Sequence, residues 1–464
     1  MKIVLANLPW KKWGKTGARA GSRWPHLKSS TESDYWPFPF FLAYSAALLR
    51  QNGFTANYIE CMNPYHPGLS REPLIRRPKR KSTGAGKFPR CVIPKPEVLK
   101  DIPKRFSRYG ITPRIFRNEL ETMPAPDLIF VTSMMTYWYP GVFEAIGICK
   151  EMYPAVPVVL GGNYATLCHD HALKFAGADL VVTGEGEQSL PHVLEPLLGE
   201  TLFTLPDRND LDSYPYPAFD LVSHLDQVPI MTSRGCPYHC TYCASNFLND
   251  GFRTRDPIKV VDEIEYWHRT FGVRNFSFYD DALLVNAEDR AIPMLQEIIN
   301  RQLDCDFHCP NGLHLRGITE EVATLMRRTR FRTIRFGFET ASLTRQKETG
   351  GKITNSETAE AVMRLKKAGY ATEEIGMYIL CGLPGQTAEE VEESIHFVKD
   401  CGARPVIAEY SPIPHTVLWE ESVRMSPFDI THEPLFHNNT LLPCRWEGLT
   451  YDMYRSLKMT ARKK

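Results

Sequence analysis

The stretch from residue 228 to residue 243, VPIMTSRGCPYHCTYC, places three cysteines in a short loop directly after an apolar segment. Residues 228–233 are predicted to form a buried strand. Cys236, Cys240 and Cys243 follow it with C-x3-C-x2-C spacing. A cubane iron–sulfur cluster takes four thiolates, so a loop with three would leave one iron open to a group from outside the protein. The sequence therefore predicts an iron–sulfur cluster in this loop.

Zinc and purely structural cysteines are the alternatives for the same loop. Structural zinc favours paired C-x2–4-C units and four ligands. No partner pair stands at a suitable spacing, although His239 could act as a fourth ligand. The other cysteines, among them Cys305 and Cys309, are scattered along the chain, and we expect them to be buried free thiols.

Six strand–helix units are predicted from the cysteine loop onward. The strands are expected at residues 228–233, 275–279, 306–310, 333–338, 374–380 and 406–410, and the helices at 257–271, 286–302, 319–328, 355–369 and 387–401. Such a series predicts a partial parallel (β/α)6 barrel of the TIM type, whose active site lies at the carboxyl ends of the strands. The cysteine loop follows the first strand.

The N-terminal part also alternates between strands and helices. Strands are predicted at residues 2–8, 54–60, 127–133, 156–160 and 179–183, with helices at 41–52, 141–152 and 169–175. This pattern predicts βαβ units in a doubly wound, Rossmann-like α/β domain. Ligands bind such sheets at the strand carboxyl ends, where Ser133-Met134, Gly161-Gly162 and Gly184-Glu185-Gly186 stand. Glycines there would let a large flat ligand approach the backbone, although plain turns have the same composition.

These patterns divide the chain into four regions. Residues 1–200 form the first domain, with a basic, proline-rich insertion at about 63–113. Residues 201–224 are a linker, residues 225–424 the barrel, and residues 425–464 a tail without an assigned role. With 464 residues, 43% hydrophobic and 23% charged, the composition is that of a globular protein of about two domains.

Targeting signals are absent from the sequence. No long apolar run predicts a membrane span, and MKIVLANLPW at the N-terminus lacks the features of a secretory signal. We therefore expect a cytoplasmic protein, in which twelve cysteines do not form a disulfide framework.

The insertion concentrates positive charge in a chain whose formal net charge is only +1. Its basic residues are Arg71, Arg76, Arg77, Lys79, Arg80, Lys81, Lys87, Arg90, Lys95, Lys100, Lys104, Arg105 and Arg108, against the acids Glu72, Glu97 and Asp101. A solvated loop is the simpler interpretation. A site for an anionic substrate or cofactor, or for nucleic acid, is the alternative.

The cysteine loop, with the aromatic Tyr242 before its last cysteine, resembles the signature of the radical S-adenosylmethionine (SAM) superfamily. The resemblance implies that Cys236, Cys240 and Cys243 bind three irons of an oxygen-sensitive [4Fe–4S] cluster. The fourth iron would chelate the amino and carboxylate groups of SAM. Reductive cleavage would then give methionine and a 5′-deoxyadenosyl radical that abstracts a substrate hydrogen. Tyr242 would lie beside the adenine.

Later strand ends are similar to further motifs of that superfamily. Asp280 and Asp281 stand where groups contact the methionine amino group, with helix capping as their alternative role. Glu339 resembles a SAM-contacting residue, and a salt bridge at the barrel rim is its alternative. Gly382 and Gly385 resemble the glycine motif that faces adenine and ribose. The segment 409–414 resembles a proline motif of cobalamin-linked members.

The N-terminal domain resembles the cobalamin-binding domain of one radical SAM subgroup. The residues that carry this likeness are Ser133, Met134, Thr136, Gly161, Gly162, Gly184, Glu185 and Gly186. The sequence lacks Asp-x-His-x-x-Gly, the motif that supplies an axial histidine to cobalt. His169 and His171 do not have that spacing, and surface helix positions are expected for them. The resemblance therefore implies cobalamin bound without a histidine ligand.

The leading hypothesis is a cobalamin-dependent radical SAM enzyme that methylates an unactivated carbon. A cobalamin-associated radical cyclisation or rearrangement, and radical modification of RNA, are the alternatives, and a non-catalytic cobalamin sensor is a third class. A methylthiotransferase is disfavoured, because Cys61, Cys91, Cys149 and Cys168 are too dispersed for a second cluster. The expected partners are a small-molecule or lipid-like substrate and a reducing protein such as flavodoxin or ferredoxin.

Overall fold

The computed structural model describes residues 2–7, 11–13, 40–77, 79–198 and 203–463. The chain divides into two compact units, one built mainly from residues up to Leu225 and the other mainly from Asp226 onward. We refer to them as the N-terminal unit and the barrel unit. None of the described helices is long and apolar enough to cross a membrane.

A five-stranded parallel sheet forms the centre of the N-terminal unit. Its order is β3 (Thr55–Glu60), β1 (Lys2–Asn7), β6 (Leu128–Thr132), β7 (Val158–Gly161) and β8 (Leu180–Val181). Counted along the chain this is the order 2-1-3-4-5 of doubly wound folds, with the switch point between β1 and β6. The predicted fold class is therefore confirmed, and β8 is shorter than predicted.

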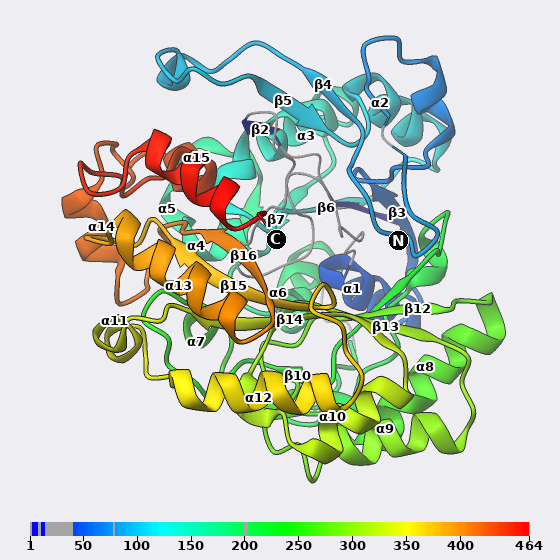
Figure 1. Cartoon of the computed structure of the whole chain (residues 1–464). Helices are drawn as coiled ribbons and strands as arrows, with labels where there is room; N and C mark the ends of the chain where they lie inside the picture. The colour runs from blue at the N-terminus through cyan, green and yellow to red at the C-terminus, as the bar shows by residue number, and fades with distance from the viewer. Residues whose placement is uncertain (1, 8–10, 14–39, 78, 199–202, 464) are drawn as a thin grey trace. The chain divides into compact units, whose positions relative to one another are not determined.

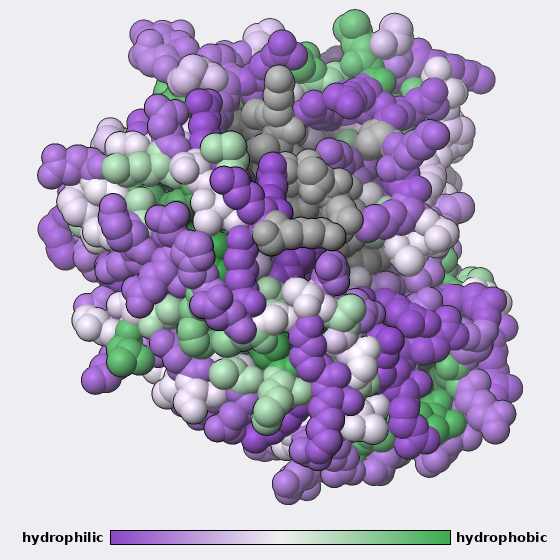
Figure 2. Space-filling view, viewed as in Figure 1, coloured by the Kyte–Doolittle hydropathy of each residue, from purple (hydrophilic) through white to green (hydrophobic). Residues whose placement is uncertain are grey.

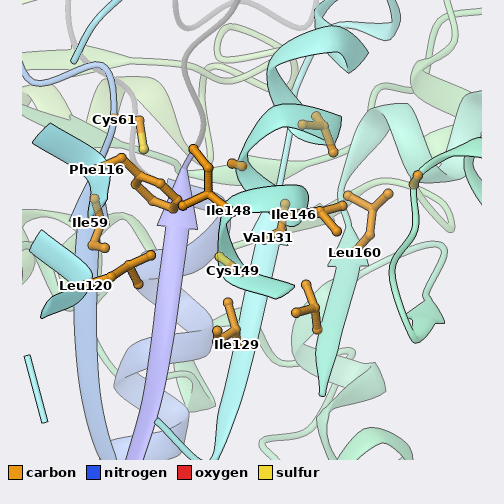
Figure 3. Close-up of a cluster of buried hydrophobic side chains, with 14 of the residues drawn as sticks. Ile59, Cys61, Phe116, Leu120, Ile129, Val131, Ile146, Ile148, Cys149 and Leu160 are labelled. Atoms are coloured by element: carbon orange, nitrogen blue, oxygen red, sulfur yellow. The ribbon is translucent and has the colours of Figure 1, made fainter. Parts of the chain in front are cut away.

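The core of this unit is the contact between the sheet and the helices beside it (Figure 3). Ile59, Val131 and Leu160 from the strands pack with side chains of α3 (Tyr139–Met152) and α2 (Pro113–Thr122). The remaining helices are α1 (Phe40–Gln51), α4 (Asn163–Leu167), α5 (His169–Phe175) and α6 (Gly186–Leu198). Burial raises the pKa of the core thiol Cys149 to about 12, so this cysteine is a structural apolar residue.

The basic insertion is an ordered hairpin-like structure. β4 (Arg90–Val92) and β5 (Phe106–Tyr109) pair antiparallel with each other, and β5 also pairs with β2 (Lys11–Trp13). The Arg80 guanidinium donates to the carbonyls of Gly86 (3.0 Å) and Lys87 (3.2 Å), and Arg108 forms an ion pair with Glu144 of α3. Part of the positive charge is therefore structural. The loop between β4 and β5 presents mainly hydrophilic side chains (Figure 2).

The barrel unit contains a six-stranded parallel sheet in sequential order. Its strands are β9 (Val228–Ile230), β12 (Asn275–Phe278), β13 (Asp306–Leu313), β14 (Phe331–Glu339), β15 (Ile375–Cys381) and β16 (Arg404–Glu409). The main helices are α8 (Pro257–Phe271), α9 (Ala291–Asn300), α10 (Glu320–Arg328), α12 (Asn355–Lys367) and α13 (Ala388–Asp400), which follow the strands along the outside of the sheet (Figure 1). This is the predicted partial barrel.

Local chemistry explains the helix boundaries. The Asp256 side chain caps α8 by accepting from the N–H groups of Ile258 and Lys259, and Gly272 ends the helix in the left-handed region at φ 70°. At the start of α12, Thr354 and Glu357 form a reciprocal capping box. These signals are visible in the sequence, which is why both helices begin within a residue or two of their predicted positions.

The tail that the sequence left without a role closes the last part of the barrel unit. It follows α14 (Trp419–Met425) and contains α15 (Tyr451–Thr460). In α15, Lys458 Nζ donates to Glu409 Oε1 at the end of β16 (2.6 Å), and the Tyr454 hydroxyl donates to the same oxygen. Lys399 of α13 donates to the Thr460 carbonyl (2.7 Å). The tail is therefore attached to the end of β16 and to α13.

A small antiparallel pair closes the base of the cysteine loop. β10 (Ser233–Arg234) pairs with β11 (Arg253–Thr254), and the Arg255 N–H donates to the Thr232 carbonyl (2.9 Å). The Arg255 guanidinium then forms an ion pair with Glu263 of α8, where the two side chains are only 7% and 1% exposed. This buried pair joins the loop base to the first barrel helix.

Replacing Arg255 by Met is expected to destabilise the protein strongly, because it leaves the Glu263 carboxylate buried without its cation. Removing one partner of a buried pair costs about 3–5 kcal/mol. Urea denaturation should show this loss. The control is Lys367→Met, which removes the exposed pair between Lys367 and Glu320 and should leave the unfolding midpoint nearly unchanged. Equal shifts of the unfolding midpoint in the two variants would contradict a stabilising role for the buried Arg255–Glu263 pair.

Candidate functional site

The cysteine loop lies beyond the carboxyl end of β9, the first barrel strand. Cys236 and Cys240 are buried and Cys243 is half-buried. The pKa of the Cys236 thiol is raised to about 11, mainly by burial and also by the neighbouring Asp281 and Cys240. Cys243 has a pKa raised by burial, Asp281, Cys240 and Cys236. The three sulfurs therefore share one environment, in which thiolates need a positive partner such as a metal centre.

Close backbone contacts hold this loop in place. Gly235 enters it at φ 80°, and a Cβ there would lie 2.0 Å from the Gly251 carbonyl oxygen. The Thr241 hydroxyl donates to the Glu348 carbonyl (3.0 Å), and the Leu418 N–H donates to the Thr241 carbonyl (3.0 Å). The loop is thus fixed by its own turn and by two other segments of the barrel unit before any cofactor binds.

The surroundings of the loop do not resemble a mononuclear zinc site. In the part of the chain that the structure describes, no three His, Cys, Asp or Glu side chains gather tightly enough to hold one metal ion. His239, the fourth ligand considered for zinc, is exposed and lies with Nδ1 2.8 Å from the Asn246 amide nitrogen.

The two aspartates after β12 have different roles. Asp280 Oδ1 accepts from the Thr232 N–H (2.9 Å), the Thr232 hydroxyl (2.7 Å) and the Ser233 hydroxyl (2.7 Å), so it fastens β12 to the exit of β9. Asp281 Oδ2 accepts from the Ser245 hydroxyl (2.7 Å) and faces the cysteines whose pKa it raises. Neither residue caps a helix, because α9 begins only at Ala291.

Glu339 ends β14 in an unusual backbone conformation. Its φ is 75°, and the pairing of β14 with β15 shifts register between Gly337 and Glu339. A non-glycine residue in the left-handed region costs about 1–3 kcal/mol and is typical of functional sites. Glu339 Oε1 accepts from Lys352 Nζ (3.2 Å), with the side chains 6% and 9% exposed. The salt bridge considered as the alternative role of Glu339 therefore exists, but it is buried, and its partner Lys352 was not predicted.

Tyr242 lies within the same group of side chains. It is buried, and its pKa is raised well above the usual value by burial, by Cys240 and by Glu339. Tyr238 stacks on His314, with ring centroids 4.1 Å apart, and burial together with Lys352 lowers the pKa of that imidazole. The structure therefore brings Tyr242 and Glu339 together beside the cysteines, and adds Lys352 and His314 to the predicted residues.

The glycine turn after β15 is organised by a glutamine. Gly382 adopts φ 96° and Gly385 φ 64°. Gln386 Oε1 accepts from the N–H groups of Gly382 (2.8 Å) and Leu383 (3.2 Å), while its amide donates to the Leu380 carbonyl (3.0 Å). Gln386 is fully buried, and its three bonds lock the turn.

In the N-terminal unit, the predicted residues gather at the ends of β6, β7 and β8. Gly162 adopts φ 90°, and a Cβ there would lie 2.3 Å from Thr132 Oγ1 and 3.0 Å from the Ser133 carbonyl oxygen. The Thr166 hydroxyl donates to the Gly162 carbonyl (3.0 Å) and accepts from the Gly184 N–H (3.1 Å). These contacts hold the three strand ends in one row. Met134 and Thr136 follow β6 and are buried.

The third strand end is open. A Cβ on Gly184 would meet no atom within 4 Å, and Glu185 Oε2 accepts from Arg208 Nε (3.5 Å) before Gly186 starts α6. Small residues and open space at this edge fit a large flat ligand such as a corrin ring.

Of the two histidines on α5, His171 is engaged within the N-terminal unit. His171 is half-buried on α5, and its Nδ1 lies 2.6 Å from the Tyr164 hydroxyl. Its ring packs against Tyr139 and Phe143, and burial lowers its pKa to about 4. The expected surface position is therefore wrong for His171, which is part of a packed aromatic cluster. His169 begins the same helix.

Comparison with known families gives one match in the barrel unit and one in the N-terminal unit. The model of the Radical SAM superfamily matches residues 230–398, and that of the B12 binding domain matches residues 116–194. The chain therefore contains a Radical SAM domain and, N-terminal to it, a B12 binding domain. These two domains support the cofactors that the sequence predicts, which are a [4Fe–4S] cluster, SAM and cobalamin.

Relatives of this radical SAM protein include enzymes of two kinds. An uncharacterized methyltransferase of Pyrococcus horikoshii is 29% identical over 355 residues, covering 70% of this chain and 72% of the relative. The anaerobic magnesium-protoporphyrin IX monomethyl ester cyclase of Rubrivivax gelatinosus is 27% identical over 349 residues, covering 66% of this chain and 60% of the cyclase.

A solved structure shares the whole architecture. The radical SAM methyltransferase TsrM of Kitasatospora setae, with tryptophan substrate and a SAM analogue bound, matches 91% of this chain and 76% of its own, with a TM-score of 0.62 and 16% identity. The likeness confirms the order of a doubly wound domain followed by a partial barrel.

Replacing Gly235 by Ala is expected to abolish cluster loading, because the new Cβ would collide with the Gly251 carbonyl and displace the cysteine loop. Iron and sulfide per chain after anaerobic reconstitution measure the effect. Gly272→Ala is the matched control: Gly272 has a similar φ of 70°, but nothing lies within 4 Å of its Cβ position. That substitution costs only about 1 kcal/mol of backbone strain and should load normally. Normal loading of both variants would refute the explanation.

Proposed function

We propose that this protein transfers a methyl group from SAM to an unactivated carbon of a small-molecule or lipid-like substrate, with cobalamin as the methyl carrier. One observation carries the proposal. A buried three-cysteine loop at the first barrel strand and an open glycine edge on a doubly wound sheet occur in one chain, which is similar over 70% of its length to a protein named a methyltransferase.

The bound cofactors would supply the difficult chemistry: a reducible cluster that cleaves SAM to start a radical, and a cobalt centre that carries methyl. Cys236, Cys240 and Cys243 would hold the cluster and leave one iron without a protein ligand. Asp281 and Glu339 each place a buried carboxylate toward the cysteine loop, where it can accept from the amino group or ribose of SAM.

The remaining residues of the proposed SAM site orient the ligand and exclude water. Tyr242 supplies a buried ring beside Glu339. The turn through Gly382 and Gly385, held by Gln386, would lie beside adenine and ribose. Asp280 acts indirectly, because its Oδ1 already accepts three hydrogen bonds from Thr232 and Ser233. The cluster further requires an external one-electron donor, and we propose flavodoxin or ferredoxin in this role.

Cobalamin would lie at the row formed by Ser133, Met134 and Thr136, by Gly161 and Gly162, and by Gly184, Glu185 and Gly186. The glycines would allow the ring to approach the backbone, and the buried hydroxyls of Ser133 and Thr136 would supply polar contacts. No histidine ligand to cobalt is proposed, since His171 is occupied within its aromatic cluster.

A radical cyclisation is the second candidate, because a named relative is a cyclase. Both reactions begin with cleavage of SAM, so the fate of its methyl group distinguishes them. We expect anaerobically reconstituted protein, given reductant, cobalamin and SAM labelled in the methyl carbon, to form 5′-deoxyadenosine and to leave the label on carbon in a product from a host-cell metabolite or lipid extract. An unlabelled cyclised product would favour the second candidate.

The control for this experiment is the triple variant Cys236→Ala, Cys240→Ala, Cys243→Ala. It should form no 5′-deoxyadenosine while still binding cobalamin. Failure of the intact protein to bind iron, or to cleave SAM, would exclude both candidate reactions.

The glycine edge gives a separate prediction for cobalamin. Gly162→Ala is expected to weaken cobalamin binding about tenfold, equal to about 1.4 kcal/mol, because the added Cβ displaces Thr132 and the Ser133 carbonyl. Equilibrium dialysis with optical detection measures the Kd. Gly177→Ala, at φ 70° with no atom within 4 Å of its Cβ position, is the matched control and should bind normally. Equal affinities would remove the strand-end edge from the cobalamin site.

A further inference from the structure

Lys352 is a buried cation that no sequence motif predicts. It follows Gly350 and Gly351, which adopt φ 114° and 60°, and precedes the capping residue of α12. Its side chain is only 9% exposed, and Nζ lies 3.2 Å from Glu339 Oε1. Burying an ion pair is seldom favoured for stability alone, since apolar side chains of similar volume do as well. The pair therefore invites a functional explanation.

The barrel is shaped to admit this side chain. A Cβ on Gly337 would lie 2.1 Å from Lys352 Nζ and 2.7 Å from Glu339 Oε1, so only glycine at that position of β14 leaves the space. Gly350 plays a similar part on the other side, because a Cβ there would lie 3.1 Å from the Cys240 Cα. Two glycines thus bring the ammonium group and the cysteine loop together.

The charge of Lys352 acts on the cysteines. The segment that carries Lys352 lies against the cysteine loop at Gly350 and Cys240, and Glu339, Cys240 and Cys236 favour the charged amine. The other ionisable groups that Lys352 influences are the His314 imidazole, whose pKa it lowers, and the Tyr238 hydroxyl. Lys352 is therefore the cation that acts on two of the proposed cluster ligands.

We propose that Lys352 is a positioning residue that raises the reduction potential of the cluster, and that Glu339 moderates this effect by pairing with it. The inference rests on the proposed function, because it requires a cluster on Cys236, Cys240 and Cys243. Adding an electron makes the cluster more negative, and a fixed positive charge nearby in a poorly solvated site stabilises that state. The electron comes from the external donor protein, and no bond forms or breaks.

The test is an EPR-monitored redox titration of the reconstituted protein without SAM. In Lys352→Met the ratio of reduced to oxidised cluster at the wild-type midpoint is expected to fall about tenfold, a shift of about 59 mV to lower potential for one electron. In Glu339→Gln, where Lys352 loses its counter-charge, the shift should have the opposite sign. Lys347→Met, which removes an exposed lysine from the preceding helix, is the control and should titrate like the wild type.

Each outcome decides the question. Opposite shifts in Lys352→Met and Glu339→Gln, with unchanged iron content, support the proposal. A fully loaded Lys352→Met with the wild-type midpoint overturns it and makes Lys352 a structural partner of Glu339, while the proposed function stands. If Lys352→Met does not load iron, Glu339→Gln alone decides, and an unchanged or lower midpoint overturns the proposal. A wild-type protein without a cluster would instead refute the proposed function.

Discussion

The arrangement of the radical SAM site depends on the hydrogen bonds that Asp280 Oδ1 accepts at the exit of β9. A loop that must present three metal ligands cannot be placed by its own short sequence, since each cysteine has several rotamers and the backbone has no regular structure. By joining the ends of β12 and β9, Asp280 fixes where the loop begins. The ion pair of Arg255 with Glu263 fixes where it returns. These two anchors hold the backbone of the cysteine loop at both of its ends, as a preorganised ligand site requires.

Several glycines in this molecule leave space for close contacts, and some of them also adopt positive φ angles. At Gly235, Gly162 and Gly337 an added Cβ would collide with backbone or with a charged group, so these residues allow contacts that no other side chain permits. The same principle serves a ligand loop, a sheet edge and a buried lysine. Close approach of this kind excludes water, and low solvation strengthens every charge interaction around the cysteines.

Much of the fold could be predicted from the sequence because its signals are local. The apolar strands of the barrel alternate with well-capped helices, and the bounds of α8 were predicted to the residue. The cysteine spacing led to the correct family. Other features depend on distant contacts. Asp280 and Asp281 are neighbours of the same type, and only the partners Thr232 and Ser245 separate their roles. Lys352 lies between two helices in a segment without periodicity, and its meaning comes from Glu339. The role of the tail could not be predicted, because α15 is held by Glu409, a residue more than 40 positions away in the sequence.

The attachment of α15 to Glu409 also bears on how the protein is made. Helix α15 is synthesised after all six strands of the barrel, so a growing chain on the ribosome carries β16 as an uncovered edge for some time. During that interval the Glu409 carboxylate has neither Lys458 nor Tyr454 to accept from. The last bonds at the end of β16 therefore form only when translation has passed α15.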